Sequence, residues 1–112
     1  MHEYGIAYDL YATARRAALE NHADRVLRVN VDVGKLAMVN PEQVVFLFDI
    51  IKEDDPLFSK STLECREVLA ETACTCGYRG NEVHVCPSCG ALPEIVKGRE
   101  IVVTNVEIEV DD

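Results

Sequence analysis

Four of the five cysteines in this 112-residue chain lie close together, in two pairs that are each followed by glycine. The second pair has the spacing Cys-x-x-Cys, at which two thiolates can grip one ion, and the first pair, Cys-x-Cys, is one residue shorter. Glycine lets the chain turn sharply after each pair, so backbone amides can point toward the sulfurs. The four thiols belong to Cys74, Cys76, Cys86 and Cys89.

Four thiolates favour a tetrahedral Zn²⁺ site with Zn–S distances of about 2.3 Å. A filled tetrahedron leaves no position for a reacting water, so the predicted site is structural. Iron is the alternative ion, because similar knuckles build rubredoxin-like FeS₄ centres. Cys65 lies outside the cluster on a predicted strand, and we interpret it as a small buried hydrophobe. His84 lies between the pairs, and we interpret it as a surface histidine.

The start of the chain, Met1-His2-Glu3, is a second place where metal chemistry can occur. The Met1 α-amine, the deprotonated His2 amide and His2 Nδ1 can close two chelate rings in one plane. Planar nitrogen ligation suits Ni²⁺ or Cu²⁺, whereas zinc prefers a tetrahedron. The fourth ligand stays open between the Glu3 amide or carboxylate, a water and a group from a partner.

The hydrophobic pattern predicts the elements that position these groups. Apolar residues at helical spacing indicate one helix near the start, and Asn40-Pro41 marks the beginning of another. Strict alternation places Leu27, Val29, Val31 and Val33 on one face of a half-buried strand, with Gly34 permitting the turn that follows. The predicted helices cover 4–22 and 41–51, and the predicted strands cover 27–33, 62–69, 94–96 and 101–110.

The order of these elements predicts an α+β fold: two helices packed on a small mixed three-stranded sheet, with an inserted zinc-ribbon module. A helix that links two strands favours a parallel pair joined by a right-handed crossover. The last strand can return to the same sheet. We therefore expect residues 1–70 and 99–112 to form one domain and residues 71–98 to form the inserted cysteine module.

The composition limits the classes of partner. The formal net charge is −9 and the sequence pI is about 4.7. This balance argues against nucleic acid and against anionic membranes, which both favour basic proteins. No apolar run approaches the ~18 residues of a membrane span, and the start lacks a signal-peptide pattern. We expect a cytoplasmic location, where thiols stay reduced and paired cysteines bind metals.

Several motifs occur together along the chain: Met1-His2-Glu3, Gly34-x-Leu36 with Val39-x-Pro41-Glu42, the Cys-Gly-Tyr and Cys-Pro-Ser-Cys-Gly block, and the closing Val106-Glu107-Ile108-Glu109. Together they resemble the HypA/HybF nickel metallochaperones. The resemblance covers essentially the whole chain. It implies a nickel-binding α+β domain made from both ends of the chain, with an inserted zinc ribbon.

The resemblance also implies a function. It implies delivery of Ni²⁺ during [NiFe]-hydrogenase maturation, with a HypB-type GTPase and the hydrogenase large subunit as partners, and some members of the family also serve urease. It assigns the essential nickel ligand to His2 and a site-shaping role to Glu3. It assigns the zinc thiolates to the four clustered cysteines. The chain departs from the family pattern in its first zinc pair, where the usual Cys-x-x-Cys would place a ligand at Ala73.

Two other functions compete with nickel delivery. One is a zinc-ribbon module that docks another protein and has no nickel role. The other is rubredoxin-like electron transfer, which predicts a coloured iron protein. The sequence contains no Gly-rich phosphate loop and no recognisable nucleophile–histidine pattern, so we expect the chain not to be an enzyme.

Overall fold

The computed structural model describes residues 3–111. These residues form two α-helices and six strands, with short 3₁₀ turns at Lys35–Ala37, Lys52–Asp54 and Pro56–Phe58. The helices are α1 (Glu3–Glu20) and α2 (Pro41–Ile51). The strands are β1 (Arg25–Gly34), β2 (Thr62–Val68), β3 (Glu71–Ala73), β4 (Arg79–Gly80), β5 (Glu94–Lys97) and β6 (Ile101–Glu109). The predicted α+β fold class is confirmed.

The chain divides into two compact units, each assembled from separate stretches of sequence. The first contains the residues up to Asp32, Val39–Arg66 and the residues from Val102 onward, and the second contains Val33–Met38 and Glu67–Ile101. The second unit therefore includes the segment after β1 as well as the cysteine region.

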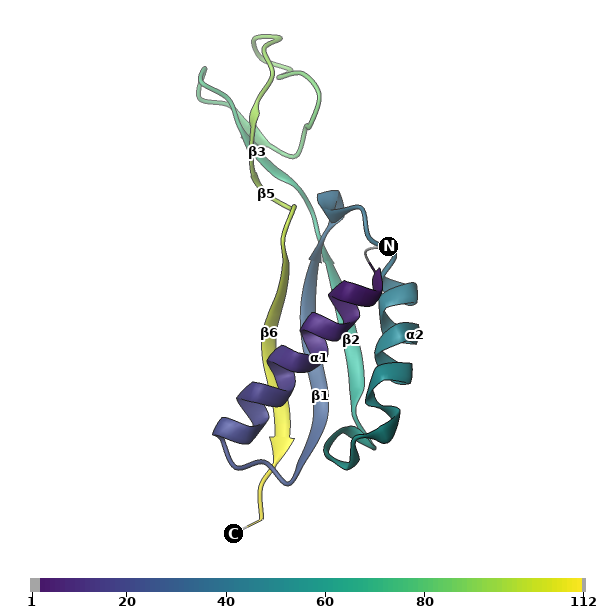
Figure 1. Cartoon of the computed structure of the whole chain (residues 1–112). Coiled ribbons are helices and arrows are strands. Elements are labelled where there is room, and N and C mark those ends of the chain that lie inside the picture. Colours follow the sequence, from purple (N-terminus) through teal and green to yellow (C-terminus); the bar gives the residue numbers. More distant parts are fainter. Residues whose placement is uncertain (1–2, 112) are drawn as a thin grey trace. The chain divides into compact units, whose positions relative to one another are not determined.

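The larger sheet has the strand order β2-β1-β6, and α1 and α2 both cover the same face of it (Figure 1). The direction of the colours along the chain shows that β1 and β2 run the same way, while β6 runs against them (Figure 1). Helix α2 connects β1 to β2, as a parallel pair requires. The sheet is thus mixed, and its central strand comes from the most regular alternating stretch of the sequence.

The two helices begin and end where local chemistry dictates. Asn40 caps α2, because its side-chain oxygen accepts the backbone N–H groups of Glu42 (3.0 Å) and Gln43 (3.3 Å), and Pro41 follows in the first helical position. Helix α1 ends at Glu20, and His22, just beyond that end, has a positive φ of 58°. The left-handed residue lets the next amide, that of Ala23, bond back to the Ala18 carbonyl at 3.0 Å.

The core of the first unit is aromatic and β-branched. Phe48 of α2 and Phe58 of the third 3₁₀ turn are both fully buried, with ring centroids 6.1 Å apart. The ring of Tyr11 lies 4.9 Å from that of Phe58, and the Tyr11 hydroxyl donates to Asp55 at 2.5 Å. This cluster joins α1, α2 and the turn after α2 into one packed body.

The structure corrects two details of the predicted strands. Leu27 is exposed and Val26 is buried in its place, so the alternation of β1 shifts by one residue at Leu27–Arg28, as at a β-bulge. The backbone hydrogen bonds agree, because the Asp24 N–H donates to the Glu109 carbonyl and the Gly34 N–H donates to the Glu100 carbonyl. Between these two bonds the chain advances ten residues on the β1 side but only nine on the β6 side. Strand β2 ends at Val68, one residue before the predicted end of that strand, and Leu69 is exposed.

Gly34 has a φ of −63°, which any residue can adopt, so the prediction that glycine is needed here for a turn is wrong. Its role is close approach, since a Cβ at this position would overlap the carbonyl of Gly98. The Leu36 N–H donates to that same carbonyl at 2.8 Å, and the Gly34 N–H donates to the Glu100 carbonyl at 2.8 Å. These bonds tie the segment after β1 to the turn between β5 and β6.

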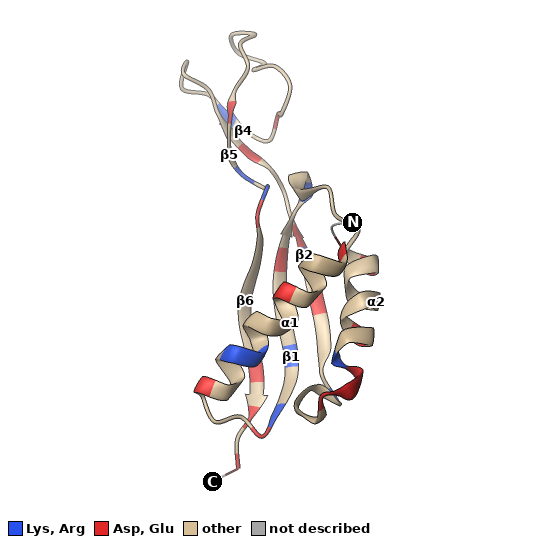
Figure 2. Ribbon diagram, viewed as in Figure 1, with Lys and Arg blue, Asp and Glu red and all other residues tan. Residues whose placement is uncertain are grey.

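Charged residues of both signs are spread along the helices and strands (Figure 2). Several basic side chains pair with acids, including Arg25 with Glu109 at 3.1 Å and Arg66 with both oxygens of Asp32 at 3.0 and 2.9 Å. Basic groups that are paired in this way are poorly available to a phosphate backbone. Among the described residues, no helix has the length and apolar character required to cross a membrane.

Candidate metal centre

A second, three-stranded sheet positions the cysteines. Its order is β4-β3-β5, with β3 antiparallel to both neighbours. Cys74 directly follows β3, and the first cysteine pair forms the turn between β3 and β4. The second pair lies in the loop between β4 and β5. The antiparallel pairing of β5 with β3 brings the two loops together.

The two cysteine loops share one backbone pattern. In the first, the Cys74 N–H donates to the Tyr78 carbonyl at 2.8 Å and the Gly77 N–H donates to the Cys74 carbonyl at 2.9 Å. In the second, the Cys86 N–H donates to the Ala91 carbonyl at 2.7 Å and the Gly90 N–H donates to the Cys86 carbonyl at 2.8 Å. Both glycines have positive φ, 99° and 79°. The first loop is thus the second with one residue removed.

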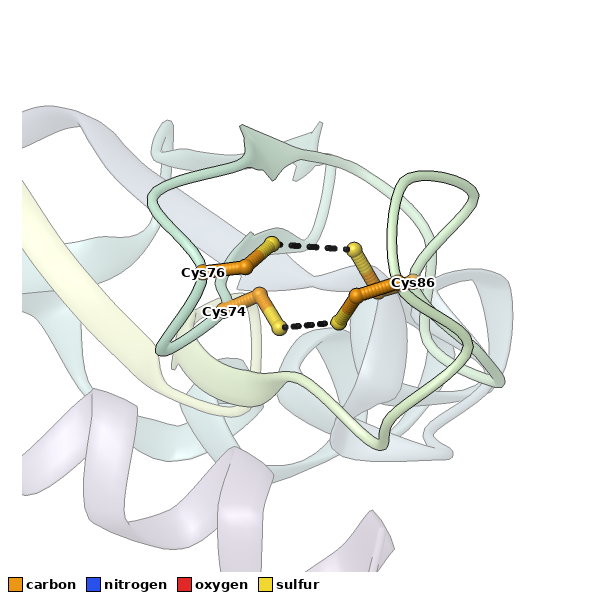
Figure 3. A group of neighbouring side chains, drawn as sticks. Cys74, Cys76 and Cys86 are labelled. Carbon is orange, nitrogen blue, oxygen red and sulfur yellow. Dashed lines mark hydrogen bonds between the residues drawn. The ribbon is translucent and has the colours of Figure 1, made fainter.

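The four sulfurs converge to within 4.8 Å of one another. Figure 3 shows the side chains of Cys74, Cys76 and Cys86 directed toward a common centre. The closest approaches join the two loops: Cys74 Sγ to Cys89 Sγ is 3.4 Å and Cys76 Sγ to Cys86 Sγ is 3.7 Å. Four sulfurs at 2.3 Å from a tetrahedral ion lie about 3.8 Å apart. The donor set and its spacing therefore fit one thiolate-bound ion such as zinc.

The electrostatics of the bare thiols also favour a cation. The pKa of the Cys74 thiol falls to about 7, because the backbone N–H of Cys76 donates to its sulfur and the Cys89 thiol does so as well. The backbone N–H of Ala91 favours the Cys89 thiolate, but hydrogen bonding of the Cys89 thiol to Cys74 and Cys76 outweighs it and raises the pKa of Cys89 to about 12. Four crowded thiols cannot all ionise until a positive ion balances them.

Each loop contributes one covered sulfur and one exposed sulfur. Cys74 and Cys86 are buried, with 8% and 2% of their surfaces exposed, whereas Cys76 and Cys89 are exposed. The ion that they surround would therefore lie near the surface of the unit, held from beneath by the two buried residues.

Among the described residues, the other positions singled out from the sequence are not members of the four-sulfur group. Met1 and His2 fall outside the described residues. Glu3 is described, and it is half-buried in the first turn of α1. Cys65 is only half-buried on β2, where burial and then the charge of Glu64 raise its pKa. His84 is exposed and does not belong to the four-sulfur group.

The carbonyls of Tyr78 and Ala91 close the two loops, a role that the sequence interpretation assigned to neither residue. Each stands directly after the glycine that follows a cysteine pair. That matching position in the two pairs is the signal that identifies them.

Comparison with known proteins gives one family. Residues 1–108 match the family described as "Hydrogenase/urease nickel incorporation, metallochaperone, hypA". The chain is 40% identical to the hydrogenase maturation factor HypA of Methanocella arvoryzae over 114 residues, covering 98% of this chain and all of that protein. It is 35% identical to the factor of the same name from Methanothermobacter thermautotrophicus, with all of both chains covered.

Two solved structures share the fold. The solution structure of the Ni metallochaperone HypA from Helicobacter pylori aligns with a TM-score of 0.75 at 22% identity, covering 97% of this chain and 98% of that one. A second solution structure of a HypA protein aligns with a TM-score of 0.77 at 23% identity, covering 99% of this chain and 98% of that one. At these identities, the likeness establishes the fold.

Proposed function

The chain belongs to the HypA family of nickel-incorporation metallochaperones, and from this membership we propose that it binds Ni²⁺ at its N-terminus and delivers the ion during maturation of a [NiFe]-hydrogenase. Urease is the other target that the family description allows. The observation that carries the proposal is the match over residues 1–108, which includes both the start of the chain and the cysteine region.

The nickel ligands in this proposal are Met1, His2 and Glu3. Met1 contributes its α-amine, and His2 contributes its amide nitrogen and Nδ1, which together make a planar nitrogen set of the kind that Ni²⁺ prefers. Glu3 adds an acidic group at the point where α1 begins. A site at the end of the chain can exchange ligands with a receiving protein, as delivery requires.

In the same proposal, Cys74, Cys76, Cys86 and Cys89 hold a structural zinc ion. The convergence of the four sulfurs supports this assignment. Four thiolates fill the tetrahedron, so this site keeps its ion and stabilises the second unit, while the N-terminal site handles the cargo. A purified zinc protein is colourless, whereas an FeS₄ centre absorbs visible light, so a visible spectrum distinguishes the two ions.

The partners in this proposal are a HypB-type GTPase and the hydrogenase large subunit. The chain has no Gly-rich phosphate loop, so any nucleotide hydrolysis during delivery is assigned to the partner GTPase.

Replacing His2 tests the nickel assignment. Protein that starts at Met1, without a tag, should bind one Ni²⁺ in a calorimetric titration, and His2→Ala should lose that binding because the variant has no imidazole Nδ1 to close the second chelate ring. His22→Ala is the matched control, since His22 is an exposed histidine at the end of α1, and it should bind nickel like the native protein. Zinc content, measured by elemental analysis, should be the same in all three proteins. Undiminished nickel binding by His2→Ala would refute the assignment.

A further inference from the structure

The two cysteine loops differ most at the residue that closes each of them. The second loop is closed by the carbonyl of Ala91, which has a small, exposed side chain. The first loop, which is one residue shorter, is closed by the carbonyl of Tyr78. The shorter loop therefore has a large side chain where the longer one has a methyl group.

The side chain of Tyr78 reaches past β4 to the start of the next loop. Its hydroxyl donates to Glu82 Oε1 at 2.6 Å. Gly80 lies beneath this bond: a Cβ at Gly80 would come within 2.9 Å of both Cε2 and Oη of Tyr78, and within 2.7 Å of Glu82 Oε1. We call Tyr78, Gly80 and Glu82 the tyrosine clamp. The absence of a side chain at Gly80 is what gives the clamp room.

The clamp rests on a fixed base. Gly80 pairs with Thr72 across β3 and β4, and the Thr72 hydroxyl, in a residue that is only 2% exposed, donates to the Gly80 carbonyl at 3.1 Å. The Asn81 side chain donates to the Ala70 carbonyl at 2.6 Å. The bond from the Tyr78 hydroxyl to Glu82 thus links the first cysteine loop to the segment that follows these anchored residues. Glu82 lies four positions before Cys86.

We infer that Tyr78 is a positioning residue for the metal centre. Through the clamp, it holds the short Cys-x-Cys loop, and the loop that leads to Cys86, at the spacing that the four sulfurs need before an ion arrives. The inference rests on the proposed zinc site and deepens it. Its consequence is kinetic: the clamped loops open rarely, so the ion leaves slowly.

Zinc release to an excess of a chromophoric chelator measures this directly. Tyr78→Phe removes only the hydroxyl and should speed release by about tenfold, the lower range for a group that orients a metal ligand. Glu82→Gln should have a similar effect. Because both changes break one bond, the double variant should release zinc no faster than either single variant. Tyr8→Phe and Glu94→Gln are matched controls, which remove an exposed tyrosine hydroxyl on α1 and an exposed carboxylate on β5, and both should release zinc at the native rate.

Gly80→Ala adds a test that keeps both partners. It should speed release to a comparable degree, because the new methyl group would push Tyr78 and Glu82 apart. Each variant is also loaded with Co²⁺, whose absorption bands report tetrahedral thiolate ligation, so that a failure to fold is visible. Native release rates in both Tyr78→Phe and Glu82→Gln, or multiplied effects in the double variant, would overturn the clamp. If the native protein holds no stoichiometric zinc, the proposed function fails instead.

Discussion

The core of the first unit consists of aliphatic and aromatic side chains, whereas the second unit is held together mainly by its cysteines and backbone hydrogen bonds. Phe48, Phe58 and four valines of β1 and α2 are covered in the first unit: Val26, Val29, Val31 and Val44. In the second unit the covered apolar side chains are small, namely Val33, Ala70, Cys74 and Cys86. Burial at about 25 cal/mol per Å² of apolar surface can account for the first unit but leaves little for the second. The zinc ion that we propose at the four cysteines would supply what the small core cannot.

Removing the ion is the strongest test of this contrast. Cys86→Ser should lose stoichiometric zinc and unfold the second unit, since structural zinc contributes on the order of 10–16 kcal/mol of apparent folding free energy in small domains. Amide hydrogen exchange should show lost protection in β3 and β5, while α1 and α2 stay protected. Cys65→Ser, at the one cysteine outside the cluster, should keep its zinc. Unchanged protection of β3 and β5 in Cys86→Ser would show that the contrast is wrong.

The reverse experiment removes hydrocarbon from the first unit. Phe48→Ala should cost about 3–5 kcal/mol of its unfolding free energy, because a fully buried aromatic ring leaves a cavity. Chemical denaturation followed by circular dichroism measures the loss, and zinc content should stay stoichiometric. Phe46→Ala, on the same helix but 58% exposed, is the matched control and should cost less than about 1 kcal/mol. Equal losses from the two substitutions would contradict the assignment of the core.

The smallest expected effect is the contribution of one carboxylate, that of Asp55, to stability and its loss in acid. Burial raises the pKa of Asp55, but hydrogen bonds from the Tyr11 hydroxyl, the Leu57 N–H and Arg15 outweigh this and leave the pKa below its usual value of 3.8. The stabilisation that the Asp55 carboxylate gives to the folded state is therefore complete above the ordinary carboxyl pKa, and it is lost as the pH falls through the lower pKa of the folded state. Asp55→Asn should lower the unfolding free energy of the first unit by about 1 kcal/mol at neutral pH.

Denaturation of native protein and Asp55→Asn from pH 7 down to pH 2 measures this difference. The gap in unfolding free energy between the native protein and Asp55→Asn should narrow only in the most acidic samples. Asp54→Asn, at the exposed neighbouring position, should follow the native curve throughout. A gap that is constant down to the lowest pH would mean that the Asp55 carboxylate does not carry the effect.

Local pattern was enough to predict the helices, the four-cysteine group and four of the six described strands, but the short strands β3 and β4 were not predicted. Asn40-Pro41 marks the start of α2, and the glycines after the cysteine pairs mark the metal loops, because each signal lies within a few residues of the feature that it controls. The missed features depend on distant partners. Tyr11 and Asp55 are 44 positions apart, and the buried ring of Phe58 lies in a turn with no periodic pattern.

The same limit explains the errors in β1. Alternation predicted that Leu27 faces inward, but the alternation of β1 shifts by one residue at Leu27–Arg28, where the register with β6 also changes. From its chain neighbours alone, Gly34 was predicted to permit a turn, whereas its actual constraint is the close approach of the Gly98 backbone. A glycine required by a close approach has the same sequence appearance as one required by its own dihedral angles.

The segment Val33–Met38 has a practical consequence for work on the cysteine unit. Its amides at Gly34 and Leu36 occupy the carbonyls of Glu100 and Gly98, so a peptide cut to residues 67–101 would leave those two acceptors bare. Such a fragment, although it would carry all four clustered thiols, would lack a segment that the intact chain supplies from more than thirty residues upstream. Grafting this metal unit onto another scaffold therefore requires two separate insertions.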